Sequence, residues 1–188
     1  MAEQPVQPTF EEWLHTVDQY ELLSWDRLPE LDLYMDQVIT LMNKILCTFT
    51  TVTEKTLTPS MINNYVKDGV LPRPEHKKYS RDHLVRLMMI CMLKSILTLP
   101  EVDTILQGLL DGETTQEMYP YFAKVQQETL RGTVERVNRC NRESPKELYR
   151  LAMELAVEAN ARRITASRIL DSLKPAEIVE EKKSKKEK

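Results

Sequence analysis

The chain has 188 residues, of which 41% are hydrophobic, with four glycines, three cysteines and a formal net charge of −3. This composition allows one ordinary domain or two small ones, and it argues against a disulfide framework because the three cysteines are far apart and odd in number. No run reaches the roughly eighteen apolar residues of a membrane span, and the first residues lack the basic start and apolar stretch of a signal peptide. We therefore expect a cytoplasmic protein with reduced thiols and no membrane partner.

The charge is polarised along the chain. Residues 1–54 carry two basic and ten acidic residues, a balance of −8, whereas residues 58–86 carry six basic and three acidic residues, a balance of +3. The small total charge is therefore no evidence against nucleic-acid binding by the second stretch. The lysine- and glutamate-rich residues 175–188 predict a solvated, disordered tail.

Helical periodicity dominates the chain, and the scarcity of glycine predicts long helices. Thr9 and Glu12 have the spacing of a capping box, which predicts that a short helix begins there. A second helix is expected over about residues 31–49, followed by a threonine-rich loop up to Thr58.

A short helix over residues 59–67 has sharp signals at both ends. Thr58 is suited to the N-cap, and Pro59 stands at the first helical position, where its missing N–H costs nothing. Gly69 is free to adopt the left-handed conformation of a C-terminal cap. The proline-rich and polar residues 71–79 that follow predict an exposed excursion, or small wing.

The rest of the chain is expected to be helical. Ser80 begins an almost wholly apolar helix that reaches about residue 96 and forms the centre of the core. The later helices are expected from Thr98 to Gly108 or Gly112 and over residues 115–142, 144–160 and 165–173. The predicted fold class is all-α with a small wing.

Polar side chains recur on one side of the 59–67 helix. Ser60, Asn63, Asn64 and Lys67 stand at positions i, i+3, i+4 and i+7, opposite the apolar side chain of Ile62. Asparagine is a poor helix former, so local stability does not explain an adjacent pair. Asparagine amides can read adenine edges in the major groove, which makes this stripe a candidate recognition surface.

The wing supplies cations directly after that helix. Arg73, Lys77 and Lys78 lie on the excursion and are suited to phosphate contacts. An equally weighted alternative is a solvated helix followed by a charged loop, because polar outward faces are the default for surface helices.

Residues 57–72 (LTPSMINNYVKDGVLP) and 78–87 (KYSRDHLVRL) resemble the winged helix-turn-helix of MerR-type transcription regulators. The chain is most similar to bacterial proteins that carry this unit inside a larger helical chain. The resemblance implies DNA-backbone contacts by Tyr65, Lys67 and Lys78. Asn63 and Asn64 stand where the family commonly has Arg and Tyr, so base contact by these amides is our own hypothesis.

Nothing in the sequence favours catalysis or a bound metal. The three histidines are isolated from one another, and no Gly-rich phosphate loop or nucleophile motif is present. We therefore expect no enzyme activity, no metal and no cofactor.

These observations predict a transcription regulator that binds double-stranded DNA, as a homodimer, through the 59–67 helix and the 71–79 wing. The expected organisation is acidic N-terminal helices over residues 1–56, including the first helix of the helix-turn-helix, then the winged unit over 57–112, C-terminal helices over 113–174 and a tail over 175–188.

One alternative function is a protein-interaction module in which the acidic N-terminal helices bind a partner. Another is a regulator with a small-molecule effector in an apolar cavity among the helices of residues 87–155.

Overall fold

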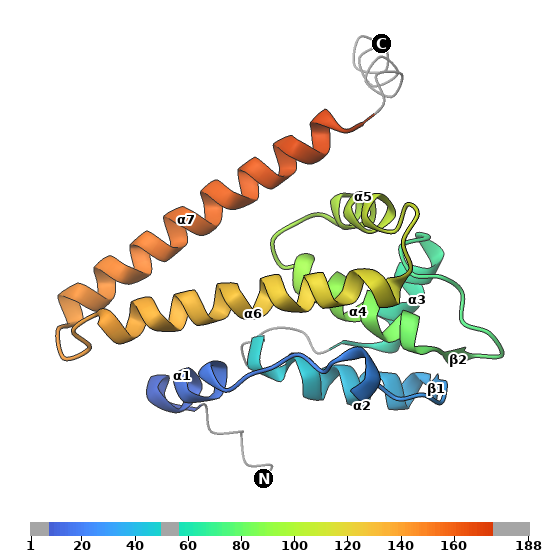
Figure 1. The fold of residues 1–188 in the computed structure, drawn as a ribbon, viewed down its shortest axis with the longest axis horizontal. Coiled ribbons are helices and arrows are strands. Elements are labelled where there is room, and N and C mark those ends of the chain that lie inside the picture. Colours follow the sequence, from blue (N-terminus) through green and yellow to red (C-terminus); the bar gives the residue numbers. More distant parts are fainter. Residues whose placement is uncertain (1–7, 50–56, 175–188) are drawn as a thin grey trace.

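A computed structural model describes residues 8–49 and 57–174 (Figure 1). The described chain is predominantly helical, with one two-stranded sheet, which agrees with the prediction of a mainly α-helical protein. In chain order the elements are α1 (Phe10–Asp18), η1 (Trp25–Arg27), β1 (Leu33–Tyr34), α2 (Met35–Leu46), η2 (Cys47–Phe49), α3 (Pro59–Lys67), β2 (Lys78–Tyr79), α4 (Arg81–Leu93), α5 (Leu99–Leu109), α6 (Thr115–Arg139) and α7 (Pro145–Ser172).

Helix α4 is the centre of the main core, as its apolar sequence predicts. Its buried side chains include Leu87 and Met88, both with no exposed surface, and they pack with residues of α2, α3, α5 and the start of α6. Full burial of one such side chain stabilises a fold by about 1.5–3 kcal/mol. The core therefore joins the elements between Leu28 and Tyr119 into one unit.

The predicted helix starts are largely confirmed. Thr9 accepts a hydrogen bond from the Glu12 N–H at 3.3 Å and its own N–H donates to the Glu12 carboxylate at 2.8 Å, completing the capping box. Thr98 caps α5 in a related way, with its N–H and hydroxyl both donating to Glu101. The hydrogen bonds from the Thr98 hydroxyl, the Ser167 side chain and the Thr98 N–H, in that order, lower the pKa of Glu101 to about 2.

The N-terminal side of α2 differs from the sequence expectation. The helix begins at Met35 rather than near residue 31, because Leu33 and Tyr34 form β1. This strand pairs antiparallel with β2, with Leu33 opposite Tyr79. A two-residue strand has no sequence signal of its own, since the partner that orders it lies more than forty residues further along the chain.

The last two predicted helices are one. Helix α7 continues from Pro145 to Ser172 without a break near residue 160. No glycine or proline interrupts this stretch, and the ion pair between Arg162 and Glu158, at 3.4 Å, links two turns across the expected boundary. The expected loop at residues 50–56 and the expected tail at residues 175–188 lie outside the described residues.

Helix α1 packs at the far end of α6 in a second, smaller core. Leu14 and Val17 of α1 contact Val134 and Val137 of α6. An ion pair between Glu11 and Arg142 adds a contact at the surface. In Figure 1, α1 lies at the opposite end of the molecule from α3. Among the described residues, no helix is both long and apolar enough to cross a membrane.

Candidate nucleic-acid interface

Helix α3 forms as its end signals predict. The Thr58 hydroxyl accepts from the Met61 N–H at 3.3 Å, and Pro59 occupies the first turn. At the other end Gly69 has φ +80°, which glycine adopts without the steric cost of a Cβ, and the chain turns so that the Leu71 N–H donates to the Tyr65 carbonyl at 3.0 Å.

The two sides of α3 have different roles. Ile62 has no exposed surface and anchors the helix in the main core. Ser60, Asn63, Asn64 and Lys67 are all exposed on the other side. The four predicted stripe residues are therefore free of the core and are presented together by one helix. Helix α2 precedes α3 in the chain and packs against it.

Tyr65 is placed differently from the other predicted contact residues of α3. The resemblance implies a DNA-backbone contact, but only 6% of Tyr65 is exposed and its ring packs in the main core. Its position on the helical wheel, next to Ile62 and Val66, already indicates packing. A side chain buried in this way has almost no surface to offer a phosphate, so we assign Tyr65 to packing.

The wing is held in place by the short sheet and ends in a strained turn. The Lys78 N–H donates to the Glu75 carbonyl at 2.8 Å, and between them His76 and Lys77 have φ of 48° and 62°. Two successive residues with positive φ are typical of a type I′ hairpin turn, which favours Asn-Gly. The turn leaves His76 and Lys77 exposed at the tip of the wing.

The predicted wing cations differ in availability. Arg73 and Lys77 are exposed. Lys78 is half-buried, with its Nζ 5.3 Å from the centre of the Tyr34 ring, so its charge is shared with a cation–π contact. In Figure 1, α3 and the loop that leads to β2 lie at the same end of the molecule. Arg73 and Lys77 are therefore the cations of the wing best placed to meet a phosphate.

Two other basic residues of the 58–86 stretch are partly buried in the fold rather than directed to solvent. The Arg81 Nη2 donates to the Leu28 carbonyl at 2.9 Å, and its guanidinium lies 5.5 Å from the centre of the Trp25 ring. Arg86 is half-buried, and burial lowers its pKa despite the charges of Asp82 and Asp103. The local balance of +3 thus overstates the charge that is available to DNA.

Lys94 is a cation that the sequence analysis did not find. It follows α4, and its Nζ lies 5.6 Å from the centre of the Tyr65 ring on α3. This contact joins residues separated by almost thirty positions, and no motif in the sequence indicates it. It places a further positive charge beside the candidate recognition helix.

His83 caps α4 directly after the wing. Its Nδ1 accepts from the Ser80 N–H at 3.1 Å and lies 2.8 Å from the Ser80 hydroxyl, and its ring meets that of Tyr79 edge-on at 5.6 Å. Burial is the main cause that lowers the pKa of His83. The carboxylates of Asp82 and Asp32 favour the charged ring but do not reverse this shift.

The lowered pKa of His83 predicts an acid-sensitive fold. The unfolded chain binds a proton to this ring near pH 6.5, whereas the folded chain resists it. The stabilising contribution is therefore complete above pH 6.5 and is lost as the pH falls below that value. We expect the free energy of unfolding of the wild type to drop between about pH 7.5 and pH 5.5 relative to that of His83→Gln, whose amide oxygen retains a capping acceptor. Parallel pH profiles in urea denaturation would contradict this.

The wing turn predicts a stabilising substitution. Because Lys77 adopts a left-handed conformation, Lys77→Gly should raise the free energy of unfolding by about 1 kcal/mol. A control inside a helix, Lys124→Gly at an exposed position of α6, should lower it by about 1 kcal/mol. Chemical denaturation of both variants measures the two signs, and a destabilised Lys77→Gly would mean that the turn has a different conformation.

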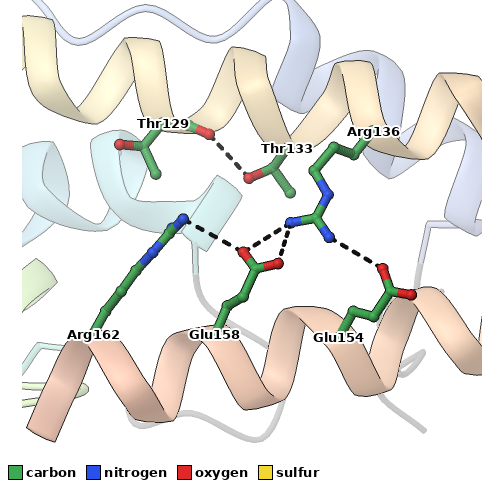
Figure 2. Close-up of polar contacts among 6 residues, drawn as sticks. All are labelled: Thr129, Thr133, Arg136, Glu154, Glu158 and Arg162. Carbon is green, nitrogen blue, oxygen red and sulfur yellow. Dashed lines mark hydrogen bonds and ion pairs between the residues drawn. The ribbon is translucent and has the colours of Figure 1, made fainter.

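A cleft of about 560 Å³ between α6 and α7 does not match the apolar cavity that a small-molecule effector would favour. Its walls are mainly charged or hydroxylic. Figure 2 shows Arg136 of α6 bound to Glu154 and Glu158 of α7, with its Nη1 2.8 Å from the Glu158 carboxylate. Arg162 also forms an ion pair with Glu158.

Within the described part of the chain, no group of three or more His, Cys, Asp or Glu side chains is arranged to hold a metal ion.

Comparison with known proteins gives a family without an assigned activity. No curated protein and no solved structure matches the chain. A family model described as a domain of unknown function (DUF1836) matches residues 23–122, which include the strands, helices α2 to α5 and the start of α6. The match begins well before residue 57, and the main core likewise joins α2 to α3. The family model matches more than half of the residues of this chain, and the chain therefore belongs to the DUF1836 family.

Proposed function

We propose that this protein is a transcription regulator that binds double-stranded DNA in a sequence-specific way. Helix α3 would enter the major groove, and the wing would contact the phosphate backbone. The observation that supports this most is the exposed stripe of Ser60, Asn63, Asn64 and Lys67 at the end of the molecule that also carries the wing. We assign the asparagines and Ser60 to base edges, and Lys67, Arg73, Lys77 and, more weakly, Lys78 to phosphates.

The position of the acidic N-terminal helix supports the proposal. Acidic residues near a DNA-binding surface would repel the phosphates. Glu11 and Glu12 lie on α1, at the far end of the molecule, and Glu11 is paired with Arg142. The strong negative charge of residues 1–54 is therefore partly remote from α3.

The test is selection of a binding site from a random pool of duplex DNA, followed by fluorescence anisotropy at two salt concentrations. Arg73→Ala combined with Lys77→Ala should weaken binding to all sequences and reduce the slope of log K against log salt by about 2. Lys124→Ala combined with Arg131→Ala makes the same charge change on the exposed surface of α6 and should leave the slope unchanged. Absence of binding, or equal slopes for both double variants, would refute the proposal.

A protein-interaction module is a second candidate, because α1 carries exposed aromatic side chains. Phe10 and Trp13 are 47% and 40% exposed, and their rings stack with centroids 6.1 Å apart. Exposed aromatic residues are enriched at protein interfaces. This alternative predicts a stoichiometric protein partner that is captured without DNA and lost in Trp13→Ala, with Lys124→Ala as the control.

A further inference from the structure

The wing has few contacts with the rest of the protein. From Pro72 to Lys78 every side chain is exposed or half-buried, whereas Leu71 before them and Tyr79 after them are 1% and 3% exposed. The sheet that joins the wing to β1 has two residue pairs. A segment with so little buried surface opens at a lower free-energy cost than a core does. The buried contacts at the two ends of the wing therefore decide how firmly it is held.

The ring of His83 lies against both ends of the wing. In Figure 1, the wing leaves the end of α3 and returns through β2 to α4. His83 stands in the first turn of α4, and its ring meets that of Tyr79, at the end of the wing, edge-on. The backbone of Arg73, near the start of the wing, lies close enough to the His83 ring to offset part of the lowering of its pKa. Only 9% of His83 is exposed, so one buried, titratable ring supports both ends.

The neutral ring is the form that fits this place. Because Nδ1 of His83 accepts from the Ser80 N–H at 3.1 Å, the neutral ring carries its single proton on Nε2. A second proton, on Nδ1, would remove the acceptor of the Ser80 N–H. The Ser80 hydroxyl, 2.8 Å from Nδ1, can accept that proton, but the N–H at the start of α4 then loses its bond. A positive charge is also unfavourable in the first turn of a helix.

The groups around the ring do not compensate for a second proton. Asp82 and Asp32 favour the charged ring, but both are exposed, and water weakens their effect. Arg86, on the next turn of α4, opposes the charge, and burial keeps Tyr79 neutral by raising its pKa. Nε2 of His83 is buried, with no hydrogen-bond partner among the described residues. A charged ring is therefore more stable in water than between the ends of the wing.

We propose that His83 is a pH-sensitive anchor of the wing: the neutral ring holds both ends of the wing against α4, and protonation of the ring releases the wing and lowers the affinity for DNA. The release does not depend on DNA, whereas its effect on affinity rests on the proposed function. The wing would open while the main core stays folded, which distinguishes this step from the overall loss of stability expected above.

The sign and size of the effect follow from proton binding. In the open wing the ring has an ordinary pKa near 6.5, whereas burial lowers the pKa of His83 in the closed wing. The closed wing is therefore fully favoured above pH 6.5 and loses that advantage as the pH falls below this value. Between pH 7.5 and pH 5.5 the ratio of open to closed wing should rise by up to about tenfold.

Amide hydrogen exchange of the full chain without DNA, followed by NMR, tests the release. The Lys78 N–H donates to the Glu75 carbonyl inside the wing, so its protection relative to the intrinsic exchange rate reports wing opening. We expect this protection to fall by about three- to tenfold from pH 7.5 to pH 5.5 in the wild type and not in His83→Gln. The Leu87 N–H, in α4 of the main core, should stay at least about tenfold more protected at both pH values. His76→Gln, which removes the exposed histidine of the wing tip, is the matched control and should keep the wild-type profile.

Fluorescence anisotropy with a duplex selected at about pH 7.5 tests the effect on DNA. The measurements use the His76→Gln background, because a charged His76 at the exposed tip would add a phosphate contact and mask the loss. The affinity of His76→Gln should fall by about three- to tenfold at pH 5.5, since only the closed wing is competent to bind. The affinity of His76→Gln combined with His83→Gln should be the same at both pH values.

The outcomes separate the two proposals. A flat exchange profile in the wild type, equal protection of Lys78 and Leu87, or a pH dependence that persists in His83→Gln would overturn the anchor. A pH-dependent wing together with an unchanged affinity for DNA would overturn its regulatory effect. Release of the wing in a chain that binds no DNA at either pH would refute only the proposed function. Circular dichroism at both pH values checks that the variants keep their helices.

Discussion

Replacing Asn63 and Asn64 by alanine is expected to separate DNA recognition from folding. Both side chains are exposed on α3, so neither substitution leaves a cavity or an unpaired buried group. Alanine is the better helix former, and the double variant should be more stable by about 1 kcal/mol. If the amides contact base edges, each loss costs about 1–3 kcal/mol of discrimination, and affinity for the selected site should fall by at least about tenfold.

The informative comparison is between the selected site and an unrelated duplex of the same length. Because the substitutions change no charge, binding to the unrelated duplex should stay the same. Asn138→Ala, at an exposed position of α6, is the matched control and should affect neither duplex. Equal losses on both duplexes would assign the asparagines to general folding or backbone contact, and unchanged affinity would remove them from the interface.

Shortening Ile62 should give the largest effect on stability among the α3 residues. Ile62 has no exposed surface and attaches α3 to the core formed around α4. Ile62→Ala should lower the free energy of unfolding by about 2–5 kcal/mol, through lost burial and the cavity left behind, whereas Ile62→Val should lower it by about 0.5–1.5 kcal/mol. Urea denaturation followed by circular dichroism measures both values.

The same series tests how α3 is positioned. Affinity for specific and for unrelated DNA should decline together in Ile62→Ala, in contrast to the asparagine variant, because the whole helix loses its support. Met61→Ala, at the half-buried neighbouring position, should cost less than Ile62→Ala. A cost below 1 kcal/mol for Ile62→Ala would mean that α3 is not held by this core.

Local sequence signals were sufficient to predict a helix wherever its ends are determined by its own residues. Thr58, Pro59 and Gly69 define α3 because capping bonds and backbone conformations act within a few positions of the residue concerned. The apolar run after Ser80 likewise predicts a central helix, because a helix that is apolar on nearly all sides can only be stable inside a core.

The sequence left a residue's role or a helix boundary ambiguous where two arguments gave different predictions. For Tyr65 the helical wheel indicates packing and the resemblance implies DNA contact, and burial in the core decides for packing. For residues 144–173 the pattern suggests two helices, but nothing in it stops the first, and the structure has one. The absence of a helix-breaking residue was the stronger signal there.

By itself, the sequence determined that the chain is mainly helical, where α3 begins and ends, and that polar amides and wing cations follow each other closely. Only the tertiary structure decided that β1 orders the wing, that Arg81 and Arg86 are partly buried, and that Lys94 lies beside Tyr65. The physical reason is range: caps and turns act between near neighbours, whereas strand pairing, burial and cation–π contacts join residues that only the folded chain brings together.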